Sequence, residues 1–62
     1  MESMIYFNVL REREPWGAGR YYVEATNDQG ERVFVTDIGG KAKVQHDAIR
    51  EANDRGLVYG VR

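Results

Sequence analysis

The stretch RYYVEATNDQGERVFVTDI, residues 20–38, decides the predicted fold. Two runs rich in β-branched and aromatic residues, 20–26 and 31–38, flank the turn sequence NDQG. Runs of this composition favour strands, and a four-residue loop that ends in glycine is a common hairpin connection. The stretch therefore predicts an antiparallel β-hairpin.

The turn also predicts the register and the two faces of this hairpin. If Thr26 lies opposite Glu31, then Val23 lies opposite Phe34. Because strand residues alternate between faces, one face is predicted to carry Tyr21, Val23, Ala25, Arg32, Phe34 and Thr36. The other face is predicted to carry Tyr22, Glu24, Thr26, Val33 and Val35. Neither face is polar, so the second face is expected to need a cover or a partner.

The segment before the hairpin, residues 3–13, predicts a further strand. One side of it carries Ile5, Phe7 and Val9, and the other carries Met4, Tyr6, Asn8 and Leu10. Both sides are apolar near its start, so the strand is expected to be central or covered on both faces. The sequence EPWGAG, residues 14–19, predicts a loop with Trp16 near its tip.

The pattern changes to helical spacing over residues 40–55. Ala42, Ile49 and Ala52 lie near one line of a helix, with Val44 and Ala48 beside it. A glycine at position 56 is a typical helix stop. The alternating residues 57–61 that follow predict a final strand.

These segments predict one small domain of the α+β class over residues 1–62. The element order is β-β-β-α-β, with a mainly antiparallel sheet and one helix packed on one face. A helix between the third and fourth strands allows a right-handed crossover. The fourth strand is therefore expected to run parallel to a neighbour of the third strand, or to insert beside the first.

The composition excludes several classes of site. With one histidine and no cysteine, the chain cannot assemble a zinc site of the Cys/His type by itself, and we expect no cofactor and no metal. Its net charge of -1 is lower than that of a strongly basic nucleic-acid binder. The apolar run 4–10 is too short to span a bilayer. We therefore expect a cytoplasmic protein without a membrane partner.

The residues that could support catalysis do not form a recognisable set. His46 has no carboxylate among its expected helical neighbours, and Ser3, near the terminus, is the only serine. A nucleophile, a base and a group that orients the base cannot all be named. The sequence therefore predicts that the protein is not an enzyme.

The sequence GGKAK at the expected start of the helix allows two interpretations. Free amides and the dipole at a helix N-terminus attract anions, so Gly39, Gly40, Lys41 and Lys43 could bind a small anion or a nucleotide. A phosphate-binding loop, however, needs four residues between its glycines and a Ser or Thr after the lysine. The favoured interpretation is a strand-to-helix joint whose lysines point into water.

Two nucleic-acid-binding families resemble this chain in arrangement. GGKAKVQHDAI is similar to the lysine-bearing second helix of double-stranded-RNA-binding domains, and the hairpin followed by a helix resembles the arm-binding domains of phage-type integrases. The first family begins with a helix, whereas this chain begins with a strand, and members of the second are usually basic. These are resemblances of topology only. The alternative function, nucleic-acid binding through a three-stranded sheet and the basic helix entrance, is predicted from Arg20, Arg32, Lys41 and Lys43, which lie near aromatic residues.

The favoured function is a small protein-interaction module that self-associates through its sheet. Aromatic residues with arginine dominate interface hot spots, and a domain of this size buries only about 60% of its unfolded surface. The residues predicted to bind a protein partner, or a second copy in a homodimer, are Trp16, Tyr22, Val33 and Val35. A small cysteine-free chain of this kind suits an accessory protein or inhibitor of phage or bacterial type.

Overall fold

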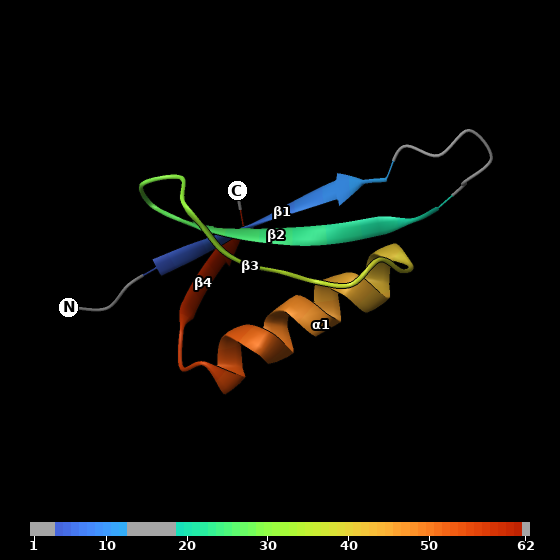
Figure 1. Cartoon of the computed structure of the whole chain (residues 1–62). Helices are drawn as coiled ribbons and strands as arrows, with labels where there is room; N and C mark the ends of the chain where they lie inside the picture. Colours follow the sequence, from blue (N-terminus) through green and yellow to red (C-terminus); the bar gives the residue numbers. More distant parts are fainter. Residues whose placement is uncertain (1–3, 13–18, 62) are drawn as a thin grey trace.

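The computed structural model describes residues 4–12 and 19–61. Along the chain its elements are β1 (Met4–Arg11), β2 (Tyr21–Asn27), β3 (Arg32–Val35), α1 (Lys41–Asp54) and β4 (Val58–Val61). The strands form one sheet in the order β3-β2-β1-β4, and α1 lies along one side of it (Figure 1). The predicted α+β class and the β-β-β-α-β order are confirmed.

The first strand, β1, is central, as predicted. It pairs antiparallel with β2 and parallel with β4. Parallel neighbours need a crossover between them, and α1 supplies it between β3 and β4. Of the two positions expected for the last strand, the structure has the one beside the first strand.

The hairpin of β2 and β3 closes on the predicted NDQG turn. The Asn27 side-chain Oδ1 accepts hydrogen bonds from the N–H groups of Gln29 and Glu31, at 3.0 and 2.9 Å. The N–H of Gly30, a residue with a φ of 82°, donates to the Asn27 carbonyl at 3.0 Å. Asn27 also donates its own N–H to the Glu31 carbonyl at 2.9 Å. The pair that closes the turn is therefore Asn27 with Glu31, whereas the predicted pair was Thr26 with Glu31.

The predicted register of this hairpin is wrong by one residue at the turn and by two residues beyond a bulge. Arg32 lies opposite Thr26, and Phe34 lies opposite Ala25 and not Val23. The shift at the turn reverses the faces predicted for Arg32 and Val33. The bulge, which leaves Val33 as an extra residue in β3, returns Phe34 and Val35 to their predicted faces. Val33 packs against the core, and Arg32 lies on the opposite face of the sheet.

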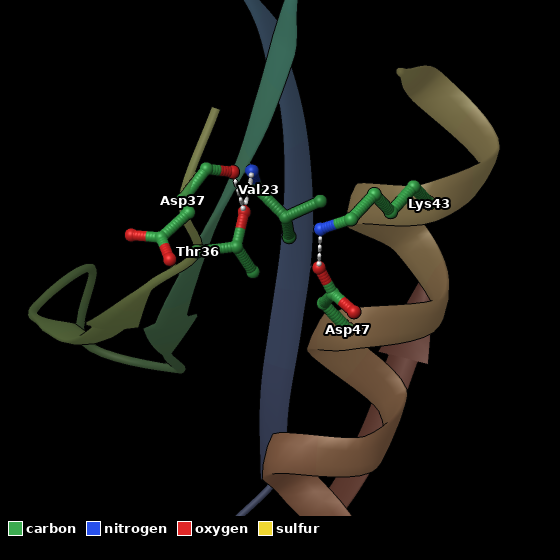
Figure 2. Close-up of polar contacts among 5 residues, drawn as sticks. All are labelled: Val23, Thr36, Asp37, Lys43 and Asp47. Carbon is green, nitrogen blue, oxygen red and sulfur yellow. Dashed lines mark hydrogen bonds and ion pairs between the residues drawn. The ribbon is translucent and has the colours of Figure 1, made fainter. Parts of the chain in front are cut away.

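A threonine side chain ends β3 at Val35, three residues before the predicted end. The Thr36 N–H donates to the Val23 carbonyl at 2.9 Å. In return, the Thr36 Oγ1 accepts the Val23 N–H at 2.9 Å and donates to the Asp37 carbonyl at 3.1 Å (Figure 2). The hydroxyl takes the place of a ladder carbonyl, so the backbone is free to turn toward α1.

The helix packs on the sheet through small side chains. Val44, Ala48 and Ala52 are fully buried, at spacings of four residues, and Ile49 is partly buried beside them. Ala42, which the predicted stripe included, is exposed. The covered stripe therefore follows Val44 and not Ala42. Its small residues let α1 approach β2 closely.

The helix ends in a Schellman motif at the predicted glycine. Gly56 has a φ of 69°, and its N–H donates to the Asn53 carbonyl at 3.0 Å. The Leu57 N–H donates to the Ala52 carbonyl at 2.9 Å. These are the two bonds of that motif. They reverse the chain and direct Leu57 back onto the core, which begins β4 beside β1.

Aromatic rings fill the core beside the small helical residues. The Phe7 ring stacks on Tyr59 at 5.0 Å between centroids and meets the edge of Phe34 at 6.3 Å. The Arg55 guanidinium lies over the Phe34 ring at 5.2 Å from its centroid. These contacts tie β1, β3 and β4 together on the side of the sheet that α1 covers.

We predict that Thr36→Val destabilises the fold by about 1–3 kcal/mol, because it leaves the N–H of fully buried Val23 without its acceptor. Thr36→Ser keeps the hydroxyl and serves as the control, with a smaller loss. Urea unfolding measures both free energies. Equal losses for the two variants would show that the hydroxyl contributes nothing.

Candidate functional site: the open face of the sheet

The face of the sheet opposite α1 is the candidate site, and we call it the open face. The strand pairings define its members, because neighbours across the sheet share a face. They are Met4, Tyr6, Asn8, Leu10, Tyr22, Glu24, Thr26, Arg32, Val35, Val58 and Gly60. In the described part of the chain the only helix lies on the other side of the sheet (Figure 1).

Large apolar side chains on the open face are exposed to water. The exposed fractions are 39% for Met4, 37% for Leu10, 47% for Val35 and 45% for Val58. They come from three of the four strands, so exposed apolar side chains lie on several parts of this face. Exposed apolar surface of this kind can mark an interaction site on a small protein.

The centre of the open face is polar, and its polar groups are paired. The Asn8 Nδ2 donates to the Glu24 carbonyl and to the Thr26 Oγ1, both at 3.2 Å. The Glu24 carboxylate lies 3.9 Å from the Arg32 guanidinium. A partner that covered this centre would therefore bury an ion pair and hydrogen-bonded groups, and would leave no lone charge.

A glycine lets side chains from β1 lie across β4. A Cβ at Gly60 would lie 2.6 Å from the Met4 methyl carbon and 3.8 Å from the Tyr6 ring. Without that Cβ, both side chains extend over the last strand. The apolar surface is therefore continuous from β1 to β4.

The structure places the predicted partner-binding residues unequally. Tyr22 and Val35 lie on the open face. Val33 does not, because the shift of the register at the turn places it toward the core. Trp16 lies outside the described residues.

The sequence analysis did not name Met4, Leu10 and Val58 as partner-binding residues. Alternation in 4–10 had already grouped Met4 with Leu10. The missing information was which face of the sheet the helix covers.

Three groups near the start of α1 have contacts within the chain. The Gly39 N–H donates to the Tyr21 carbonyl at 2.9 Å. The Lys43 Nζ lies 2.9 Å from the Asp47 carboxylate (Figure 2), and the Lys41 Nζ lies 5.9 Å from the centroid of the Tyr21 ring. These contacts favour a strand-to-helix joint, because an anion would compete with Asp47 for Lys43.

The basic residues proposed for nucleic-acid binding do not form one patch. Arg20 precedes Tyr21, which pairs with Gly39 next to the helix start, and Arg20 is exposed there. Arg32 lies opposite Thr26, at the other end of β2, and its guanidinium is near Glu24. The structure therefore brings Arg20 to the same end as Gly40, Lys41 and Lys43 and keeps Arg32 apart.

His46, the histidine considered as a catalytic candidate, is exposed on α1. Among residues 4–12 and 19–61, no group of three or more His, Asp or Glu side chains could hold a metal ion. No helix in this part of the chain is long and apolar enough to cross a membrane.

The covered side of the sheet carries a smaller apolar cleft beside α1. Its volume is about 280 Å³, and its lining residues are Phe7, Val9, Val23, Gln45, Ile49 and Tyr59. Val9, which is 37% exposed, is the valine at its rim. Because Val9 matches Val35 in residue type and lies on the opposite face, it offers a control for experiments on the open face.

No protein-family model, curated protein or solved structure matches this chain significantly. Its function is therefore inferred from the geometry of the open face.

We predict that Lys43→Met raises the pKa of Asp47 toward its ordinary value. The hydrogen bond from Lys43 is the main cause that holds the pKa of Asp47 below that value. The contribution of Asp47 to stability is present above the ordinary pKa of the group and is lost as the pH falls through the lowered pKa. Carboxyl NMR titration measures this pKa.

Lys41→Met is the matched control for this titration. Lys41 contacts the Tyr21 ring and not Asp47, so the pKa of Asp47 should stay lowered in this variant. An unchanged pKa of Asp47 in Lys43→Met would contradict the ion pair.

Proposed function

We propose that this protein is a non-catalytic interaction module that binds a protein partner through the open face. The observation that carries the proposal is the apolar surface of Met4, Leu10, Val35 and Val58 on a sheet face that α1 does not cover. Burial of apolar surface is the dominant favourable term in protein association. An accessory protein or inhibitor of phage or bacterial type remains part of this proposal, on the basis of size and composition.

The residue pattern of the open face favours a protein partner over permanent exposure to water. Strands with one solvated face normally alternate between apolar and polar residues, whereas here Met4, Tyr6 and Leu10 share the solvated side of β1. Tyr6 and Tyr22 add aromatic rings, which are enriched at interface hot spots. The charged pair of Glu24 and Arg32 adds a polar contact that is satisfied before binding.

Nucleic-acid binding is the less favoured alternative. Arg20, Lys41 and Lys43 gather at one end of the molecule, which supports it. Against it, Lys43 pairs with Asp47 and Arg32 with Glu24, so two of the four candidate cations are partly neutralised. Phosphate contacts of this kind would make binding strongly dependent on salt.

The test is capture of partners from the native host's lysate, with and without nuclease, by tagged wild-type chain, Val35→Asp and Val9→Asp. We expect a stoichiometric protein that survives nuclease and rebinds when both components are purified. Val35→Asp should reduce its binding at least about tenfold, because the new charge is buried without a counterpart. Val9→Asp, with the same change on the other face, should retain it.

Two outcomes would contradict the proposal. Binding that is lost with nuclease would favour the nucleic-acid alternative and would make Arg20, Lys41 and Lys43 the candidate binding residues. Binding that Val9→Asp abolishes and Val35→Asp leaves intact would assign recognition to the covered side of the sheet. Circular dichroism of both variants checks that they fold.

A further inference from the structure

We infer that the partner on the open face is a second copy of this chain, packed sheet against sheet about a two-fold axis that passes near Asn8. This inference rests on the proposed function, because it names the occupant of the same surface. Three properties of the open face support it: its charge, the arrangement of its polar and apolar groups, and its extent.

The open face carries no net charge that would select a different partner. Among the strand residues that define it, the charged side chains are Glu24 and Arg32, which lie 3.9 Å apart. A face with a single sign of charge would repel its own copy and attract a complementary protein. Because these two charges already neutralise each other, two copies can approach without like-charge repulsion.

The polar and apolar groups are arranged so that the face complements itself. β1 and β2 are the two inner strands, and they carry the polar cluster of Asn8, Glu24 and Thr26. Apolar residues surround this cluster, with Met4 and Val58 toward one end and Leu10 and Tyr22 toward the other.

In a two-fold interface the same patch meets itself. An axis through the polar cluster therefore places polar groups opposite polar groups and apolar groups opposite apolar groups. A partner of different sequence would have to reproduce that pattern.

Asn8 provides the polar contact on this axis. The Nδ2 group of Asn8 donates to β2 within the chain. Because a carboxamide oxygen can accept hydrogen bonds, we expect the Asn8 Oδ1 to accept one from the polar cluster of the second copy. A single buried asparagine on a symmetry axis is a known way to select one register among several apolar packings.

The extent of the face predicts a weak dimer. The strands have eight, seven, four and four residues, and each residue covers about 3.3 by 4.8 Å, so the face is on the order of 360 Å². Specific stable interfaces bury about 800 Å² per partner, and weak transient ones bury less than about 600 Å². We therefore expect a dissociation constant in the micromolar range and a dimer that depends on concentration.

The sheet edges are a less suitable contact for the second copy. The edge strands β3 and β4 contain four residues each. Short edge strands are one of the features that limit edge-to-edge pairing. The face, which presents side chains from all four strands, offers the larger apolar surface.

Sedimentation equilibrium of the full chain tests the inference, at concentrations from about 5 μM to about 1 mM that bracket a micromolar constant. Wild type should pass from monomer to dimer across this range. Val35→Asp should weaken the dimer at least about 30-fold, because each copy brings an unpaired charge to the interface. Val9→Asp should dimerise like wild type.

A charge exchange at Asn8 tests the position of the axis. In Asn8→Asp and in Asn8→Lys, like charges face each other across the axis, so each variant alone should be monomeric at pH 7. An equimolar mixture of the two should form a one-to-one heterodimer, because the charges are then opposite. A mixture that remains monomeric, while wild type dimerises, would overturn this axis.

Failure of the inference and failure of the proposed function give different results. A wild-type chain that is monomeric at about 1 mM, far above an expected dissociation constant of about 50 μM, would reject the second copy and leave the open face for another protein. A dimer that Val9→Asp disrupts and Val35→Asp does not would reject both the second copy on this face and the open face itself as the interaction surface.

Discussion

The packing of Val44, Ala48 and Ala52 against β2 is the contact on which the rest of the structure depends. These small, fully buried residues let one helix approach the sheet closely, and they leave most of the core volume to Phe7, Phe34 and Tyr59. A single helix covers one face of a four-stranded sheet. The other face must then be solvated or covered by another molecule.

The residues of the uncovered face are more apolar than is usual for a sheet face exposed to water. Met4, Tyr6, Leu10 and Val35 occupy positions where a solvated antiparallel sheet usually has polar residues. The polar residues that are present, Asn8 and Thr26, are used in hydrogen bonds within the sheet. For a domain with a small core, burial of this face would add stability that the isolated chain lacks.

The two candidate sites, the start of α1 and the open face, differ in which of their groups have partners within the chain. At the start of α1, the Lys43 side chain is paired with Asp47 and the Gly39 N–H with the Tyr21 carbonyl. On the open face, the polar groups are paired but the apolar groups are not. A binding surface requires groups that gain free energy from a partner, and the apolar side chains of the open face are the larger such set.

Local chemistry made several parts of this protein predictable from the sequence alone. Strand alternation separated Ile5 and Phe7 from Met4 and Leu10. The NDQG turn, the helix and the glycine stop at position 56 depend on contacts between residues close in the chain, so their composition sufficed. The same alternation predicted that Tyr22 and Val35 share the face opposite Val23 and Phe34.

Only the tertiary structure decided the features that depend on contacts between distant segments. The one-residue shift that exchanges the faces of Arg32 and Val33, and the bulge beyond it, arise from pairing with β2. Thr36 ends β3 because Val23 supplies its N–H. The rotation of α1 that buries Val44 and exposes Ala42 is set by the sheet beneath it. Alternation divides a strand into two sides, but it cannot tell which side a helix will cover, because that choice is made by the packing of the whole chain.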